Sequence, residues 1–334
     1  MGLPEERSTA RRYQTGPTHE KDVMLMETGS HAHGEDPRNA DVKISVNGQI
    51  VARRDAVISV FDSGFLLGDG VWEGIRLHNG KLAFIDRHLD RLYEGAKAID
   101  IDIGLTPDEM HDRILATCRA NDMESGVHIR LVVSRGLKTT PYQSPRANIG
   151  GATVVIIPEW KQPNPAVLET GLRLHTVHVH RGAPDVQDPS WNSLSKLNCI
   201  TACIQAEKAG ADEGLMLDPQ GFVATCNSTH FFIVRGGEVW TSSGLYCLGG
   251  ITRGNVLSVA KGLGIPAFEK TFPLTKVYSA DEAFVTGTFA GLIPVREVDG
   301  RTIGDGTPGP LTRKLRQGYY DLVDRVCPPK SVPV

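Results

Sequence analysis

The chain has 334 residues, with 36 Lys and Arg against 39 Asp and Glu, and carries a net charge of −3 at pH 7. This length predicts about two domains, and near-neutral charge argues against a nucleic-acid-binding protein. No apolar run approaches the roughly 18 to 20 residues of a membrane helix. Six scattered cysteines without a CxxC pair, and an N-terminus without an apolar stretch, predict a reduced, cytoplasmic protein.

Residues 1–40 are polar, contain Pro and Gly, and have no lasting hydrophobic periodicity. This composition predicts a flexible N-terminal tail, because such a segment buries too little apolar surface to offset its loss of conformational entropy. His31 and His33 lie in this segment. Two histidines in a mobile tail are weak evidence for a metal site, and we predict none.

Residues 41–160 predict a small α/β domain. It begins with a hairpin around Asn47-Gly48, a pair suited to a turn with positive φ. The second of two predicted helices begins with Thr106 and Glu109 at capping-box spacing. The predicted elements are strands at 42–46, 49–52, 56–62, 128–136 and 152–160, and helices at 86–98 and 106–121.

Residues 161–166, which are polar and rich in Pro, predict a linker. A large α/β domain at 167–326 and a C-terminal tail at 327–334 are expected to follow. Because strands alternate with helices in both halves, we expect an α/β (α+β) protein with a cleft between two domains. The predicted elements are strands at 172–180, 213–218, 222–226, 231–237, 238–243 and 282–287, and helices at 195–210, 253–263 and 311–326.

Two glycine-containing turns in the large domain are candidate phosphate sites. Gly249–Arg253 lies between a predicted strand and a predicted helix, where a helix N-terminus exposes backbone N–H groups suited to an anion. The same pattern is also common in turns without a ligand. Thr286–Thr288 ends another strand and offers further hydroxyls. Residues 69–76 bring glycines, an aromatic ring and an arginine together, which fits either a site or a tight turn.

Four segments in this order resemble the class IV (fold type IV) pyridoxal-phosphate-dependent aminotransferases. The resemblance covers about residues 41–325, and the EGIR and HLDRL stretches are most similar to the branched-chain amino acid aminotransferase branch. It implies a two-domain fold, a pyridoxal 5'-phosphate site in the cleft between the domains, and a homodimer. The segments are VFDSGFLLGDGVWEGIR (60–76), RHLDRLY (87–93), GGITRGNVL (249–257) and FVTGT (284–288).

The resemblance also implies roles for individual residues. Arg91 matches the arginine that binds the cofactor's phosphate, and a guanidinium suits a phosphate because it donates two parallel hydrogen bonds. Arg76 and Arg130 match residues on the substrate side of the site, although each could instead form an ion pair at the surface. His230 is either a base or a structural histidine. The remaining phosphate-binding residues are Ile251, Thr252 and Thr288, and the substrate-side residues are Trp72, Arg76, Arg130 and His230.

The chain departs from the family pattern at the catalytic lysine. Family members bond the cofactor's aldehyde to one lysine, which also carries the reacting proton. Counting along the chain places Asn192 there, and an amide cannot form that bond. Lys196 lies four residues further on, about 6 Å along the axis if the helix already runs there. Lys196 is therefore either a relocated catalytic lysine or an ordinary helix lysine.

A second departure is Thr225, which stands where the family has a glutamate against the pyridine nitrogen; it is alternatively an ordinary strand threonine. Leu67 replaces a common tyrosine. Two hypotheses follow. The first is a pyridoxal-phosphate-dependent aminotransferase with Lys196 as the catalytic residue, acting on a branched-chain L-amino acid with 2-oxoglutarate, with Asn192 and Thr225 beside the cofactor. The alternative has lost transamination and is a lyase-like enzyme or a binding protein.

Overall fold

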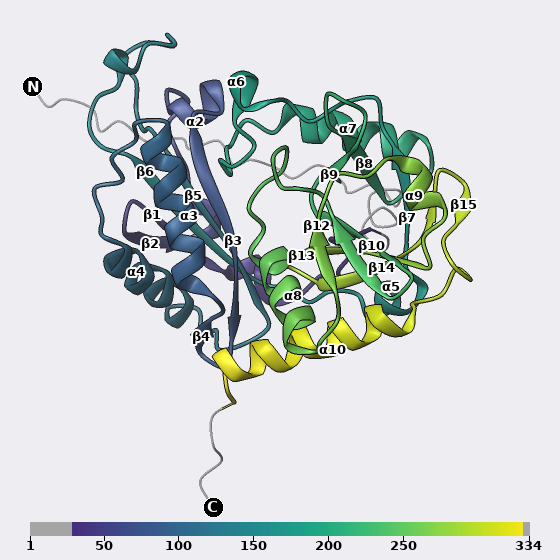
Figure 1. Ribbon diagram of the computed structural model, residues 1–334. Coiled ribbons are helices and arrows are strands. Elements are labelled where there is room, and N and C mark those ends of the chain that lie inside the picture. Colours follow the sequence, from purple (N-terminus) through teal and green to yellow (C-terminus); the bar gives the residue numbers. More distant parts are fainter. Residues whose placement is uncertain (1–28, 330–334) are drawn as a thin grey trace, which may run out of the picture.

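The computed structural model describes residues 29–329, and it contains two β-sheets, each with helices packed against it (Figure 1). The smaller sheet is antiparallel, with strand order β2-β1-β6-β5-β3-β4. Two amphipathic helices, α3 and α4, contact this sheet and each other. The bounds are β1 Lys43–Val46, β2 Gln49–Ala52, β3 Gly70–His78, β4 Lys81–Leu82, β5 Val127–Ser134, β6 Thr153–Trp160, α2 Ser63–Leu67, α3 Ile85–Ala98 and α4 Pro107–Arg119, with short 3-10 helices at Pro37–Asp41, Arg53–Asp55 and Pro145–Ala147.

Local sequence signals explain several of these elements. The β1–β2 hairpin turns at Asn47 and Gly48, both of which have positive φ, as predicted. The capping box of α4 is also confirmed, since Thr106 Oγ1 accepts from the Glu109 N–H and Glu109 accepts from the Thr106 N–H. The strand predicted at 56–62 is wrong. This segment is irregular and leads into α2, and all its apolar side chains except Ala56 are exposed.

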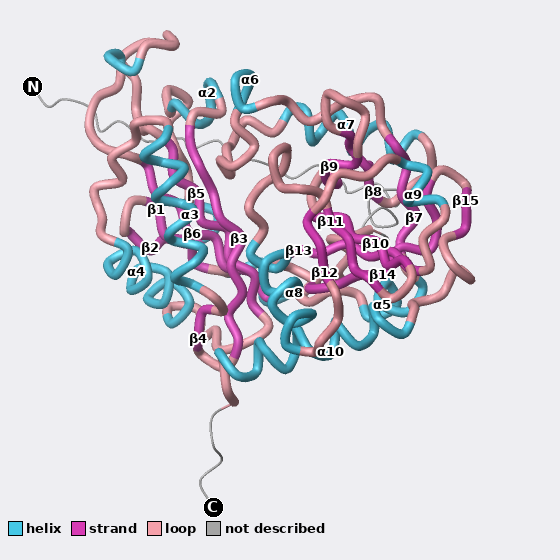
Figure 2. The backbone as a smooth tube through the Cα atoms, in the orientation of Figure 1, coloured by secondary structure: helices cyan, strands magenta, loops and turns pink. Residues whose placement is uncertain are grey.

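The larger domain has a mixed sheet in the order β12-β11-β10-β13-β14-β7-β8-β9, with β15 beside β14. Figure 2 shows the strands in magenta and the helices in cyan. Helices α8 and α10 pack against β13, and α7 contacts β7 and β8. The bounds are α5 Pro165–Thr170, β7 Leu172–Thr176, α6 Pro184–Gln187, α7 Leu197–Lys208, β8 Glu213–Leu217, β9 Val223–Cys226, β10 His230–Arg235, β11 Glu238–Thr241, α8 Ile251–Gly262, β12 Ala267–Glu269, α9 Leu274–Tyr278, β13 Glu282–Gly287, β14 Gly291–Val298, β15 Arg301–Thr302 and α10 Pro310–Val326.

The chain ends differ from the predicted tails where the structure describes them. Helix α10 runs from the large domain towards β4 (Figure 1). At its end Cys327 is buried, and the Cys327 carbonyl accepts a hydrogen bond from the Asn79 side chain. At the other end, parts of residues 29–40 are anchored to the domains: Ala32 is only 3% exposed, and the Asn39 side chain donates to the Trp160 carbonyl, while about half of the segment is exposed. The remainder of the predicted N-terminal tail, residues 1–28, lies outside the described residues.

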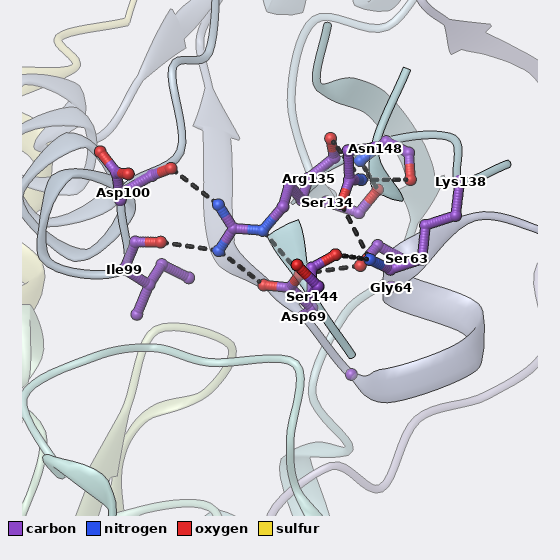
Figure 3. A network of polar contacts seen from close by, with 12 residues as sticks. Ser63, Gly64, Asp69, Ile99, Asp100, Ser134, Arg135, Lys138, Ser144 and Asn148 are labelled. Carbon is purple, nitrogen blue, oxygen red and sulfur yellow. Dashed lines mark hydrogen bonds and ion pairs between the residues drawn. The ribbon is translucent and has the colours of Figure 1, made fainter. Parts of the chain in front are cut away.

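A polar network joins the α2 region of the small domain to the end of β5 (Figure 3). Arg135 donates two hydrogen bonds to the Asp69 carboxylate, at 2.7 and 3.0 Å, and two more to the carbonyls of Ile99 and Asp100. Burial alone would raise the pKa of Asp69, but Arg135 and the Ser63 hydroxyl outweigh it and hold this pKa below its usual value. The network therefore fixes the loop that leads into β3.

Replacing Arg135 with methionine is expected to lower the free energy of unfolding by about 2 kcal/mol, because it leaves a half-buried carboxylate without its cation. The measurement is the urea midpoint at pH 7. Arg146→Met is the matched control, since Arg146 is an exposed arginine in the neighbouring loop. Equal midpoints for the two variants would contradict a stabilising role for the network.

Candidate active site

A cavity of about 430 Å³ lies between the two domains, and both contribute to its walls. No Asp or Glu side chain is among the described residues that line it. Four cationic side chains do line it, so the cavity favours anionic ligands such as phosphates and carboxylates. These cationic residues are Arg91, Arg130, Arg181 and Lys196.

Arg91 is positioned by a buried acidic partner. Its Nε and one terminal nitrogen donate to the two carboxylate oxygens of Glu73, at 2.8 and 2.7 Å, and its other terminal nitrogen donates to the Gly249 carbonyl. Glu73 is fully buried, and burial alone would raise its pKa. His88 and Arg91 outweigh burial and hold the pKa of Glu73 below its usual value, so the carboxylate remains charged. The pair therefore fixes the guanidinium at the cavity wall.

The N-terminus of α8 faces the same cavity. Gly250 is the N-cap and supplies no side-chain acceptor, so the backbone N–H groups of the first turn have no side-chain cap. Ile251 and Thr252 line the cavity together with Thr288. These three residues are called the phosphate cradle below, and their role in binding phosphate stays a prediction. Thr286 Oγ1 is buried, lines the cavity and has no partner among the described residues. The uncapped helix end and this unpaired hydroxyl fit a bound phosphate.

Gly250 is required by close packing against His230, because a Cβ atom added to Gly250 would clash with Nε2 of that imidazole. We expect Gly250→Ala to displace the ring or the helix N-terminus and to weaken phosphate binding about tenfold, which equals about 1.4 kcal/mol. The measurement is inorganic phosphate affinity by calorimetry. Gly262→Ala, at the far end of the same helix with open space around it, is the control. Unchanged affinity in Gly250→Ala would contradict the cradle.

Lys196 reaches the cavity from the start of α7. The helix begins at Leu197, not at residue 195 as predicted, and Lys196 occupies the N-cap position. Its amine donates to Asn192 Oδ1 at 3.2 Å and lies 5.5 Å from the centre of the Trp72 ring. Burial and the charges of Arg181 and Arg91 lower the pKa of Lys196 to about 8. Lys196 is the only lysine among the described residues lining the cavity.

This lowered pKa predicts a pH dependence. Because the fold disfavours the protonated amine, the reactive neutral form of Lys196 predominates above about pH 8 rather than above pH 10.5. In cofactor-free protein, acylation of Lys196 by acetic anhydride should rise about tenfold per pH unit below pH 8 and level off above it. Mass spectrometry of the labelled peptides measures this, with exposed Lys208 as the internal control. A rise at Lys196 that continues to pH 10 would contradict the shift.

The structure brings most of the predicted substrate-side residues to the cavity. The Arg130 guanidinium stacks over Trp72, 3.7 Å from the ring centre, and both residues line the cavity. His230 lines it too, but next to Gly250 at the phosphate cradle, and burial lowers the pKa of His230 to about 3, so it remains neutral. Arg76 does not line the cavity. It is buried, donates to the Lys161 carbonyl and stacks on Phe289.

Asn192 and Thr225, the two residues that differ from the family pattern, also line the cavity. Asn192 is buried, and its carbonyl accepts from the Trp72 N–H at 2.9 Å, which joins the segment before α7 to β3. Thr225 is buried on β9, and its hydroxyl donates to the Thr229 carbonyl at 2.8 Å. The cavity therefore contains neutral groups where the family resemblance implies a lysine and a glutamate.

Sequence reasoning missed several cavity residues. Arg181 donates to the Tyr246 carbonyl and to Cys199, and nothing in its local sequence distinguished it from a surface arginine. Thr286 is predicted only as part of the Thr286–Thr288 turn, and the FVTGT segment is the sequence signal that contains it. Ser30 and His31 line the cavity although they belong to the segment predicted as a mobile tail. Among the described residues, no group of three or more His, Cys, Asp or Glu side chains could hold a metal ion.

The described residues combine a two-domain α/β fold with a cationic inter-domain cavity, an uncapped helix N-terminus and one cavity lysine. A family model described as amino-transferase class IV matches residues 70–298. The chain therefore belongs to the class IV aminotransferases, as the sequence motifs predicted, and is an enzyme of amino-group transfer. No helix in the described part of the chain is long and apolar enough to span a membrane.

Individual relatives place the chain near the branched-chain branch. It is 43% identical over 284 residues to a Methanocaldococcus jannaschii protein provisionally named a branched-chain-amino-acid aminotransferase, covering 84% of this chain and 96% of that protein. It is 35% identical over 291 residues to the branched-chain-amino-acid aminotransferase of Pseudomonas aeruginosa, covering 85% and 93%. The branched-chain aminotransferase of the archaeon Thermoproteus uzoniensis, solved with norvaline, superposes with a TM-score of 0.76 at 32% identity, covering 85% and 95%.

Proposed function

We propose that this protein transfers amino groups with pyridoxal 5'-phosphate as its cofactor and Lys196 as its catalytic lysine. The observation that carries the proposal is the meeting of three features in one cavity. These are an amine with a lowered pKa, an uncapped helix N-terminus, and an arginine held by a buried carboxylate. A phosphate and an aldehyde on one small ligand would use all three.

The residues present fit that cofactor. Arg91, Thr252 and Thr288 would hold the phosphate, and the unpaired Thr286 hydroxyl supplies a further donor. Pyridoxal phosphate, when bound, supplies an aldehyde and an electron-withdrawing ring. Lys196 would hold the cofactor through its amine and move a proton at the reacting carbon, and Asn192 would orient that amine through its side-chain oxygen.

For the substrates, we propose a branched-chain L-amino acid as donor and 2-oxoglutarate as acceptor. The similarity to enzymes named for branched-chain amino acids supports the donor. Arg130 supports a carboxylate-bearing substrate, because it lines the cavity and its guanidinium makes no hydrogen bond to an acidic side chain of the described residues. The six cysteines are all unpaired, in keeping with the cytoplasmic location that remains our prediction.

We further propose a homodimer. Exposed apolar side chains lie on three segments: residues 57–67, the loop 137–149, and helix α7. Backbone hydrogen bonds join the first two segments, since Lys138 donates to the Phe61 carbonyl. Phe65 and Leu197 are 68% and 78% exposed, which is costly for a monomer in water. Analytical ultracentrifugation of the parent and of Phe65→Asp tests the assembly.

The experiment that tests the proposed function begins with the absorbance of the purified protein. Cofactor bonded to a lysine absorbs at roughly 410–430 nm. Borohydride reduction followed by peptide mapping should place the adduct on Lys196, and a panel of L- and D-amino donors with 2-oxoglutarate should identify the substrate. Absence of both the band and the adduct after incubation with pyridoxal phosphate would reject the proposal.

A further inference from the structure

A short N-terminal segment, residues 29–33, forms part of the cavity wall, although the matched family region begins only at residue 70. Ala32 within it is buried in the core of the large domain, and its carbonyl accepts from the Asn164 N–H at 3.0 Å. Ser30 is also buried, and its hydroxyl lies 3.4 Å from that of Ser228. These contacts hold the segment against the cavity from both sides of His31.

His31 presents its ring to the cavity. The imidazole stacks on Phe289, with ring centres 5.8 Å apart and planes 7° from parallel, and Ser30 Oγ lies 3.0 Å from His31 Nδ1. Phe289 directly follows Thr288 of the phosphate cradle and also contacts His128 edge-on. The His31 ring therefore covers an aromatic face that would otherwise be open to a ligand.

His31 lies at the Phe289 end of the cavity, where the Lys161 amine is also 5.2 Å from the centre of the Phe289 ring. His31 keeps more than a third of its surface exposed, and partial burial together with the cations Lys161 and Arg130 lowers the pKa of its imidazole. His230, at the cradle, is instead influenced by Arg253 and Arg91. At neutral pH His31 is therefore an uncharged flat ring beside Arg130, and it contributes bulk rather than charge to this end.

We propose that His31 is a specificity-determining residue of the substrate side, and that its ring limits how far a substrate side chain extends over Phe289. Compact aliphatic side chains of a substrate fit beside the His31 ring, and aromatic side chains are disfavoured because the ring occupies the space that they need. The inference rests on the proposed function, because it assigns the substrate end of the same site. It adds a residue from a segment outside the matched family region.

The test uses full-length holoenzyme and two acceptors, 4-methyl-2-oxopentanoate and phenylpyruvate, with one amino donor. His31→Ala should lower the KM for phenylpyruvate about tenfold relative to that for the aliphatic acid, because the vacated space accepts an aromatic ring. The cofactor absorbance of each variant shows that the site is loaded, and the ratio of the two KM values is the quantity compared with the parent. His31→Phe, which restores a stacked ring of similar size, should return the parental KM ratio.

His33→Ala is the matched control. His33 belongs to the same segment and also contacts Phe289, with ring centres 6.2 Å apart, but it does not line the cavity. A KM ratio in His31→Ala equal to that of the parent, or an equal shift in His33→Ala, would overturn the inference. Should the parent transfer no amino group, the proposed function fails, and calorimetric affinities for the same two acids would still show whether His31 excludes the aromatic one.

Discussion

Replacing Lys196 with alanine is expected to abolish amino transfer, with a loss of at least about 10⁴-fold in kcat/KM. The loss follows from the cavity itself, where no other described lysine could replace the amine. Lys196 lies in hydrogen-bond contact with Asn192 and has a lowered pKa, both of which suit a nucleophile and proton carrier at neutral pH. The measurement is single-turnover amino transfer at saturating pyridoxal phosphate.

Two further variants make this result specific. Lys196→Arg keeps the positive charge but supplies no nucleophile at neutral pH, so it should lose activity as fully as the alanine variant. Lys208→Ala changes an exposed lysine in the last turn of the same helix and should leave kcat/KM unchanged. Residual activity above about 1% in Lys196→Ala would show that another group carries the proton. It would contradict the catalytic role of Lys196, and Asn192, at the family's usual lysine position, would be the next residue to test.

The sequence predicted the fold well where local rules act alone. The Asn47-Gly48 hairpin and the capping box at Thr106 depend on neighbouring residues, and both are confirmed. The apolar pattern at 56–62 predicts a strand, but the segment is irregular, because such a pattern also occurs on an exposed surface. Periodicity cannot distinguish burial in the chain's own core from exposure on an outer face.

In the candidate site, too, a local sequence pattern does not reveal which residues meet in the folded chain. Arg91 could be found from the HLDRL stretch, because its motif is local. Its partner Glu73 lies on β3 and the cavity residue Arg181 in the loop after β7. Their relation to Arg91 on α3 is visible only when these elements are packed together. The sequence does not predict that His31 lines the cavity, because a polar N-terminal segment is typical of disorder. Only tertiary contacts such as that between Ala32 and Asn164 show that the segment is held in place.

Arg91→Ala is expected to weaken binding of pyridoxal phosphate about 100-fold, because charge-assisted hydrogen bonds contribute about 1.5–3 kcal/mol each and 1.4 kcal/mol is a factor of ten. Equilibrium dialysis against pyridoxal phosphate measures this affinity. The same titration with pyridoxal, which has no phosphate, should show little change. The difference between the two ligands therefore isolates the phosphate contact from any general damage to the site.

Stability has to be separated from binding in this variant, since Arg91 also compensates the fully buried Glu73. Removing the guanidinium leaves a buried charge with only His88 beside it, and this should cost about 3–5 kcal/mol of unfolding free energy. Adding Glu73→Gln removes that charge, so the double variant should regain much of the stability while phosphate affinity stays low. Arg87→Ala, on the same helix but outside the cavity lining, is the control. If the double variant regained phosphate affinity together with stability, Arg91 would be a structural residue and the phosphate would be held by α8 and the threonines alone.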